Sequence, residues 1–376
     1  MSHDPPFPSG SGPAADSGEL ADGSSPVSVA ERGRYVEGSL LGRGGMGEVR
    51  WLHDDLLQRD VARKTTLRGL SPQAEARLLR EARLTAHLEH PGIVPVYDAG
   101  RDEEGRLYFT MRVVRGQTLA RAFAESPPPR LTGPWLRHFL DACEAVAYAH
   151  SVGVIHRDLK PSNILVGAFG ETQVGDWGLA AWLNDRPLGP TDEPGEPPGP
   201  GLTRDGAVVG TPAYMSPEQA RGEPATPASD VWALGAVLYE LLGGEPPLGR
   251  GSSAETRARL PSPPSPARLP GVPADLWALV ARALQPSPTD RYPTAQQLAE
   301  DLARWLDGLP VHAHTYSRWE LLVRTARVWR APLTVGGLAA VALVAGGALA
   351  WQRTADERDR ALVAEAEAVE ARLAAD

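Results

Sequence analysis

Cysteine is almost absent from this chain: Cys143 is the single cysteine among 376 residues. A disulfide within one chain needs two cysteines, so a disulfide framework is excluded, and a reducing compartment suits the folded part. Cys143 falls in the helix expected over residues 132–150, where Leu136, Phe139 and Val146 recur at the spacing of a buried stripe. This position predicts a small core residue, not a nucleophile.

An excess of positive charge is also lacking. The chain has 38 Lys and Arg residues against 47 Asp and Glu residues, a net charge of −9. No basic patch with interleaved aromatic residues occurs, so the sequence argues against nucleic-acid binding. Residues 1–33 contain no apolar run, which predicts a disordered tail. A secretory signal is not expected there, because it needs a basic start and an apolar core.

Only one stretch stays apolar over a long distance. Residues 332–351 carry no charge and reach the length of about 20 residues that a bilayer core requires. Arginines crowd the N-terminal side, and Trp329 and Trp351 lie at the two edges, which favours a single transmembrane helix over a buried core helix. The arginine excess predicts that the preceding residues lie in the cytoplasm and the C-terminus outside, and the expected location is a plasma or inner membrane. Residues 310–331 then form a juxtamembrane segment.

The ends of this span leave two questions open. Ala342, Gly346 and Ala350 form a small-residue face that would allow a homodimer, although so alanine-rich a span shows such faces by chance. Residues 352–376 are helix-prone and predict a short extracytoplasmic stub. Either the chain is a fragment of a longer receptor, or its outer part is only that stub.

The most informative stretch reads HRDLKPSN over residues 156–163 and is followed by Asp176. A phosphoryl group in transfer carries charge on its oxygens, so a protein must position the reactants and neutralise that charge. Asp158 is a candidate proton acceptor, and Lys160 is a candidate phosphate-binding cation. Asn163 and Asp176 offer the oxygen ligands that Mg²⁺ prefers.

These residues match the catalytic-loop pattern H-R-D-L-x-x-x-N completely, so the chain resembles the eukaryotic-like protein kinases. The alternative, a surface loop that happens to collect charge, is disfavoured because partner motifs occur elsewhere in the right order. A glycine loop with the pattern G-x-G-x-x-G-x-V would let backbone amides approach phosphate oxygens. Its residues are Gly42, Gly44, Gly47 and Val49.

The resemblance implies further nucleotide-binding residues. Lys64, in a V-A-x-K strand, would reach the α- and β-phosphates of ATP, and Glu81 occupies the position that pairs with that lysine in kinases. Met111 would be the gatekeeper. The adenine ring would be lined by Leu41, Val49, Ala62 and Leu165, and bound by the backbone of Arg112 and Val114.

Residues 176–218 should form the activation loop, whose centre is rich in proline and glycine. By resemblance, Arg157 would hold this loop once Thr203, or less plausibly Thr191, is phosphorylated. The family pattern also pairs Glu218 with Arg291. Two residues depart from the pattern: Trp177 replaces the usual Phe, and Ser216 replaces the usual Ala, a change from which little effect is expected.

These observations predict an α+β fold: the two-lobed protein-kinase fold over residues 34–309, followed by one transmembrane helix. The small lobe would span residues 34–111 and the mainly helical lobe residues 114–309. The resemblance to bacterial transmembrane serine/threonine kinases implies transfer of the ATP γ-phosphate, with Mg²⁺, to serine or threonine on protein substrates. A pseudokinase is the first alternative, and a small-molecule phosphotransferase of similar fold is the second.

Overall fold

A five-stranded antiparallel sheet and one helix form the small N-terminal lobe. The computed structural model describes residues 33–44, 47–67, 71–125, 134–183, 211–249, 253–320 and 330–373. The strand order is β1-β2-β3-β5-β4, so the last two strands exchange places relative to the chain order. The strands are β1 (Tyr35–Arg43), β2 (Gly47–Asp54), β3 (Arg59–Thr66), β4 (Val96–Arg101) and β5 (Leu107–Arg112).

Helix α1 (Pro72–Ala86) covers this sheet. Its apolar residues Leu78 and Ala82 lie one turn apart and pack against Leu107 and Phe109 of β5. The helix begins at Pro72, a residue suited to this position because proline lacks the N–H that a first helical residue would leave unpaired. Ser71 has the extended backbone of an N-cap, but its side chain makes no capping hydrogen bond.

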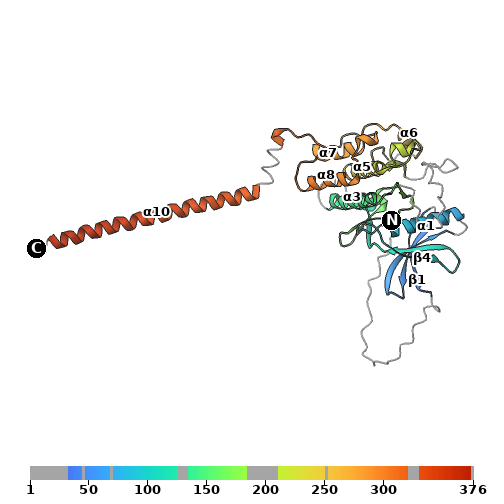
Figure 1. Ribbon diagram of the computed structural model, residues 1–376, viewed down its shortest axis with the longest axis horizontal. Coiled ribbons are helices and arrows are strands. Elements are labelled where there is room, and N and C mark those ends of the chain that lie inside the picture. Colours follow the sequence, from blue (N-terminus) through green and yellow to red (C-terminus); the bar gives the residue numbers. More distant parts are fainter. Residues whose placement is uncertain are drawn as a thin grey trace, which may run out of the picture.

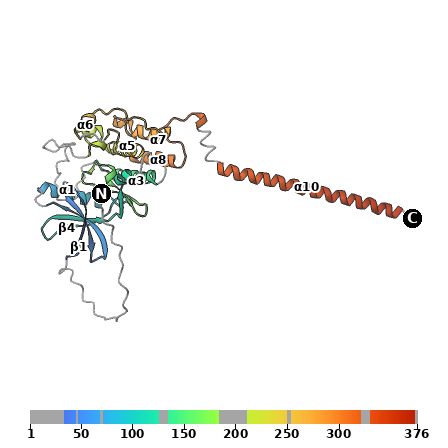
Figure 2. The same ribbon diagram turned by 180° about the vertical axis from the view of Figure 1, so that it is seen from behind.

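The larger lobe is built around helix α5 (Pro227–Gly243), which is buried from Ser229 to Leu242. Apolar residues dominate this helix on all sides, as expected for a helix surrounded by other elements. In Figures 1 and 2 it lies among α3, α7 and α8, with the sheet on the opposite side of α3. The lobe's α-helices are α2 (Leu119–Glu125), α3 (Trp135–Ser151), α4 (Pro217–Ala220), α5, α6 (Ser253–Arg259), α7 (Ala274–Ala283) and α8 (Ala295–Leu306).

Several short strands and 3-10 turns lie in the segments that connect the longer helices and strands. Three strands pair in the order β6-β8-β9, and β7 pairs with β10. Cys143 of α3 is fully buried in the core, as predicted. The elements are β6 (Gly116–Thr118), β7 (Val154–Ile155), β8 (Ile164–Gly167), β9 (Thr172–Val174), β10 (Ala181–Trp182), and the 3-10 turns η1 (Pro161–Asn163), η2 (Pro212–Tyr214) and η3 (Pro288–Asp290).

The C-terminal helix α10 (Arg330–Leu373) is one continuous element of 44 residues. It contains the predicted span 332–351 and most of the predicted stub, with no break between them. Among the described residues, α10 is the one helix that is long enough and apolar enough to cross a membrane. Leu338, Val344 and Trp351 are more than 70 % exposed, and Figure 1 shows the helix pointing away from both lobes.

Several sequence predictions lie outside the described residues. These are the predicted tail up to residue 32, the centre of the glycine loop at residues 45–46, and the activation loop over residues 184–210 with both Thr191 and Thr203. The α+β fold with a sheet-based small lobe and a helical large lobe is confirmed. The domain boundaries stay predictions.

Candidate active site

Lys64 lies on the sheet face that looks toward the larger lobe. Val49 pairs with Lys64, and Ala62 pairs with Met111, so these side chains share one face of the sheet. The ammonium Nζ of Lys64 lies 2.6 Å from Oε1 of Glu81 and 3.0 Å from Oδ1 of Asp176. The expected lysine–glutamate contact is therefore present, and it joins the sheet, α1 and the loop after β9.

One ammonium group lies between the carboxyl groups of Glu81 and Asp176, and burial raises the pKa of Glu81. Burial lowers the pKa of Lys64, but the charges of Glu81 and Asp176 outweigh burial and the pKa is raised. Burial raises the pKa of Asp176, and the Lys64 ammonium reverses this shift, so that pKa is lowered. Asp176 therefore stays ionised at neutral pH, and its side chain is 48 % exposed. The exposed anion is available to a cation.

Asp230 of α5 holds the backbone of the catalytic loop. Its carboxylate accepts the N–H of His156 at 2.8 Å and the N–H of Arg157 at 2.9 Å. Nε2 of His150 contacts the same carboxylate at 2.8 Å. Arg157 has a φ of 71°, a strained value for a residue other than glycine. Its carbonyl oxygen also accepts a hydrogen bond from Nε2 of Gln219 at 3.1 Å. Asp230 and Gln219 therefore hold the strained backbone directly, and His150 contacts the carboxylate of Asp230.

Asp158 lies at the end of that strained turn, where other groups orient both carboxylate oxygens. Nζ of Lys160 lies 2.6 Å from Oδ2 of Asp158 and 3.0 Å from Oγ1 of Thr211. The backbone N–H of Thr211 donates to Oδ1 of Asp158 at 3.1 Å. The predicted proton acceptor and the predicted phosphate-binding cation are thus in direct contact with each other and with Thr211, near the end of the expected activation loop.

Asn163 and Asp176 form a fitting pair of metal ligands. Nδ2 of Asn163 donates to the carbonyl oxygen of Asp158 at 2.9 Å, which leaves the amide oxygen Oδ1 as the group for a cation. The backbone N–H of Gly175 donates to the carbonyl oxygen of Asn163 at 2.9 Å, so the residue before Asp176 is adjacent to Asn163. Two hard oxygen ligands leave further positions for phosphate oxygens and water, as a divalent metal requires.

The glycine loop combines one crowded glycine with two open ones. A Cβ at Gly47 would lie 2.5 Å from the backbone oxygen of Thr65, so only glycine fits beside β3. A Cβ at Gly42 or Gly44 would meet nothing within 4 Å. Those two positions leave the backbone open to a ligand. The N–H of Gly44 donates to the carbonyl oxygen of Gly47 at 2.9 Å, which closes the loop.

The predicted adenine-lining residues surround the junction of the two lobes. Ala62 is buried, Val49 and Leu165 are half-buried, and Leu41 is 45 % exposed at the strand irregularity in β1. At the last residue of β5, the N–H of Arg112 donates to the carbonyl oxygen of Pro95 at 3.1 Å. The N–H of Val114 donates to no backbone carbonyl of the described residues. Their role in binding a base stays a prediction.

Trp177 makes a hydrogen bond that phenylalanine lacks. Nε1 of Trp177 donates to the carbonyl oxygen of Val174 at 3.3 Å, and its ring centroid lies 4.5 Å from that of His156. The side chain is 2 % exposed. The indole therefore ties the residue after Asp176 to strand β9 by a specific bond as well as by packing.

We expect Trp177→Phe to loosen this loop while the lobe stays folded. Loss of one neutral hydrogen bond costs about 1 kcal/mol, which corresponds to about fivefold faster local opening. Amide hydrogen exchange over residues 175–178 of the full chain would measure this change. Trp319→Phe is the matched control, because Trp319 is 73 % exposed and lies outside the loop. Unchanged exchange in Trp177→Phe would contradict the role of the indole N–H.

Ser216 has a larger part than the sequence indicated. Its hydroxyl oxygen accepts the N–H of Gln219 at 3.4 Å, and the side-chain oxygen of Gln219 accepts the N–H of Ser216 at 3.2 Å. This reciprocal capping box starts α4, and alanine would remove half of it. Because Gln219 also holds the carbonyl oxygen of Arg157, the cap is continuous with the catalytic loop.

The predicted pair between Glu218 and Arg291 is confirmed. Its two hydrogen bonds measure 2.7 and 2.8 Å, and both residues are almost fully buried. Ser229 donates to the same carboxylate at 2.8 Å. Burial raises the pKa of Glu218, but the Arg291 guanidinium outweighs burial and the pKa is lowered. The pair joins α4 to the residue that directly follows η3.

Comparison with known proteins agrees with this geometry. The family described as the protein kinase domain matches residues 35–302. The chain belongs to the protein kinase family. The matched region contains all the candidate residues described above, from Leu41 to Arg291. Family members in general use ATP and a divalent metal, which fits the oxygen ligands Asn163 and Asp176.

Individual relatives match more than two thirds of the chain. Serine/threonine-protein kinase PknB of Mycobacterium tuberculosis is 41 % identical over 289 residues, which are 74 % of this chain and 44 % of the relative. Serine/threonine-protein kinase PknD of Protochlamydia amoebophila is 36 % identical over 289 residues, 71 % of this chain and 29 % of the relative. The chain thus spans less than half the length of these curated relatives.

Sequence reasoning missed the residues that act through the backbone. His150 and Gln219 carry no motif signal of their own, since a helical histidine and a glutamine after proline are common on surfaces. Thr211 lies within the expected activation loop, and its contacts with Asp158 and Lys160 join segments more than fifty residues apart. The spacing of Gln219 after Ser216 was the one local signal that would have indicated a cap.

Proposed function

We propose that this chain is a membrane-anchored serine/threonine protein kinase, which transfers the γ-phosphate of ATP, with Mg²⁺, to hydroxyl groups of proteins. The observation that carries this proposal is the bridge from Lys64 to Glu81 and Asp176, with Asp158 held by Thr211 across the same inter-lobe region. Mg²⁺ on Asn163 and Asp176 would neutralise charge on the phosphates.

The remaining steps belong to the chain's own residues. Lys64 would hold the α- and β-phosphates, and the open backbone at Gly42 and Gly44 would cover them. The substrate hydroxyl would lie against Asp158, which accepts its proton as the oxygen bonds to the γ-phosphorus and the bond to ADP breaks. Lys160 is already within reach of both Asp158 and Thr211, which favours serine or threonine as the acceptor.

The test is phosphorylation of protein by the full chain in detergent or lipid discs. With labelled ATP and Mg²⁺ we expect label on phosphoserine and phosphothreonine, and loss of the label when the metal is chelated. ATP binding without any transfer would favour the pseudokinase, which the five residues Lys64, Glu81, Asp158, Asn163 and Asp176 argue against. If no peptide of a library is phosphorylated and a small molecule is labelled instead, the result would favour the small-molecule phosphotransferase.

A second part of the proposal is autophosphorylation on the activation loop. Arg157 is half-buried, and within the described residues its guanidinium makes no hydrogen bond. Burial lowers the pKa of Arg157, Asp230 opposes that shift, and the nearby Arg80 adds to it. Two arginines close to each other suit a doubly charged phosphate, which brings three acceptor oxygens.

We expect Thr203→Ala to lower the activity of the kinase by about tenfold or more, because each charge-assisted hydrogen bond contributes about 1.5–3 kcal/mol. Thr191→Ala, the weaker candidate, is the matched control and should retain most activity. Arg157→Gln should lose activity to a similar extent and stop responding to a phosphatase. Activity rates, together with a phosphosite map by mass spectrometry, measure this. Full activity with neither threonine phosphorylated would remove the regulation.

Anchoring in a membrane rests on α10. The exposed apolar surface of Gly336–Ala368 and the arginines before it support a single pass with the kinase lobes in the cytoplasm. Resistance of the full chain to extraction from membranes at alkaline pH is the expected result. A homodimer through Ala342, Gly346 and Ala350 remains a proposal that cross-linking in membranes would test.

A further inference from the structure

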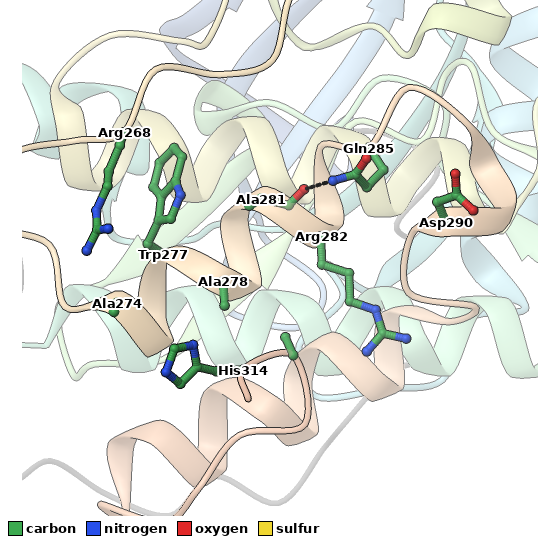
Figure 3. A pocket seen from close by; sticks show the side chains of 10 residues that line it. Arg268, Ala274, Trp277, Ala278, Ala281, Arg282, Gln285, Asp290 and His314 are labelled. Atoms are coloured by element: carbon green, nitrogen blue, oxygen red, sulfur yellow. Dashed lines mark hydrogen bonds between the residues drawn. The ribbon is translucent and has the colours of Figure 1, made fainter. Parts of the chain in front are cut away.

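A pocket of about 600 Å³ opens on the larger lobe, lined by residues outside the proposed active site. Ala274 and Ala278 of α7 are small and lie one turn apart, and Trp277 stands beside them. Figure 3 shows Arg268 and Arg282 on opposite sides of Ala278 and His314. The pocket therefore has small residues along its middle, an indole at one side and a guanidinium toward each end.

The pocket is cationic in a chain of net charge −9. Among the described residues, neither Arg268 nor Arg282 forms an ion pair, and Arg268 is exposed. The guanidinium of Arg282 lies 4.5 Å from the ring centroid of Tyr292, which orients it without neutralising it. Asp290 is the one acid on the lining. Two guanidinium groups against one acid favour an anionic ligand, and Figure 3 shows Asp290 beyond Arg282, on the side away from Arg268.

His314 belongs to a segment that is fixed on the lobe. Asp301 accepts the N–H of His312 at 2.7 Å and the N–H of Ala313 at 3.0 Å. The hydroxyl of Tyr316 accepts the N–H of Val311 at 3.0 Å, so the segment closes on itself. The lobe therefore holds the chain as far as Tyr316, past the predicted boundary at residue 309.

This attachment places the pocket next to the point where the chain leaves for α10. His314 lines the pocket, and Tyr316 is two residues further along. The 14 residues from Tyr316 to Arg330 span at most about 50 Å when fully extended, at about 3.5 Å for each residue. A lobe anchored by α10 cannot move the pocket farther than that from the start of the helix.

We propose that this pocket binds the headgroup of an anionic phospholipid in the membrane that α10 enters. The phosphate would lie between Arg268 and Arg282, and the indole of Trp277 would contact the glycerol and upper acyl region, where tryptophan is favoured. Arg318, two residues after Tyr316, is exposed and adds a further positive charge to the segment that leads toward α10. This inference rests on the proposed membrane anchoring and is independent of the proposed kinase activity.

The experiment uses the full chain in lipid discs, with phosphatidylcholine alone or with phosphatidylglycerol added at three parts in ten. We expect phosphatidylglycerol to slow amide hydrogen exchange over residues 268–278 and 312–316 by about tenfold, because two arginines gain a nearby anion. Arg268→Gln with Arg282→Gln should abolish the difference between the two lipids. Arg259→Gln, an exposed arginine on α6 with the same charge change, should preserve it.

The remaining outcomes separate the two proposals. Equal exchange in both lipids, or slowing that persists in the double variant, would overturn the pocket while leaving the anchor intact. Arg268→Gln alone guards against misfolding, because this side chain is exposed and should still reduce the protection. Protection by a phosphopeptide in phosphatidylcholine discs would assign the pocket to a protein partner instead. A chain washed from the discs at alkaline pH would overturn the anchor, and the lipid site with it.

Discussion

Asp158→Asn is expected to lower kcat by about 10²–10⁴-fold, the usual contribution of a positioned general base. Asparagine has nearly the same shape, and its side-chain oxygen can still accept the N–H of Thr211, so the loop should keep its conformation. What is lost is the capacity to take the proton of the substrate hydroxyl. The fold-change in kcat, measured with the full chain and a protein substrate, checks this directly.

Two accompanying measurements isolate the chemical step. The KM for ATP should stay close to that of the unaltered kinase, because Lys64 and Asp176 are untouched. Asp307→Asn is the matched control: Asp307 is an exposed residue after α8 with the same charge change. A kcat for Asp158→Asn within threefold of the unaltered kinase would contradict the assignment of Asp158 as proton acceptor.

Arg291→Met is expected to destabilise the larger lobe by about 3–5 kcal/mol, since it leaves the buried Glu218 carboxylate without its cation. The side chain of Arg291 also donates to three backbone carbonyl oxygens, at 2.7 Å to Gln285, 2.7 Å to Ala228 and 3.1 Å to Pro286. All of these bonds would be lost together. The midpoint of urea unfolding of the full chain in detergent, followed by tryptophan fluorescence, measures the change.

The control is an exposed pair in the same lobe. Arg221→Met breaks a contact of 2.7 Å with Glu223, but both side chains are at least 36 % exposed, so about 0–1 kcal/mol is expected. Adding Glu218→Gln to Arg291→Met should recover part of the loss, because no ionised carboxylate then remains buried. Equal destabilisation by Arg221→Met and Arg291→Met would show that burial does not decide the effect.

The same pair predicts a dependence on pH. The pKa of Glu218 is lower in the folded kinase than in the unfolded chain, where a glutamate titrates near pH ~4.3. The unfolded state therefore binds the proton first, and the stabilisation is complete above that pH. It is lost as pH falls through the lower, folded value. Without the guanidinium, burial alone raises the pKa of Glu218 in Arg291→Met, so the difference in stability between the unaltered kinase and this variant should shrink as pH falls from about 7 toward about 4.

Local sequence was sufficient where one segment determines its own chemistry. The loop HRDLKPSN and the Val-Ala-Arg-Lys strand each follow from residue types at fixed spacing, and the structure brings them to the expected elements. The pair Glu218 and Arg291 was implied by the family resemblance, and the structure confirms it. The apolar stripe of α3 likewise predicted the burial of Cys143. Even the long C-terminal helix follows from composition alone, because an apolar run of that length has few other stable conformations.

The contacts among these segments needed the three-dimensional structure. No spacing rule indicates that His150 shares a carboxylate with the catalytic loop, or that Gln219 holds the strained carbonyl of Arg157, because each contact joins residues brought together by helix packing. Ser216 was taken for a neutral replacement, whereas its hydroxyl caps a helix. The pocket at Arg268 and Arg282 has no sequence motif, because separate parts of the chain line it, among them the loop before α7, helix α7 itself, and the segment that contains Ala313 and His314.

The amino-acid sequence by itself determined the family and the α+β fold and predicted the reacting side chains, because these depend on local spacing and on which residues can bind phosphate, metal or proton. Only the tertiary structure decided which oxygen meets which nitrogen: the shared ammonium of Lys64, the doubly held Asp158 and the fixed exit at Tyr316. Hydrogen bonds and ion pairs act over about 3 Å, and distances that short between remote segments are set by packing of the whole core.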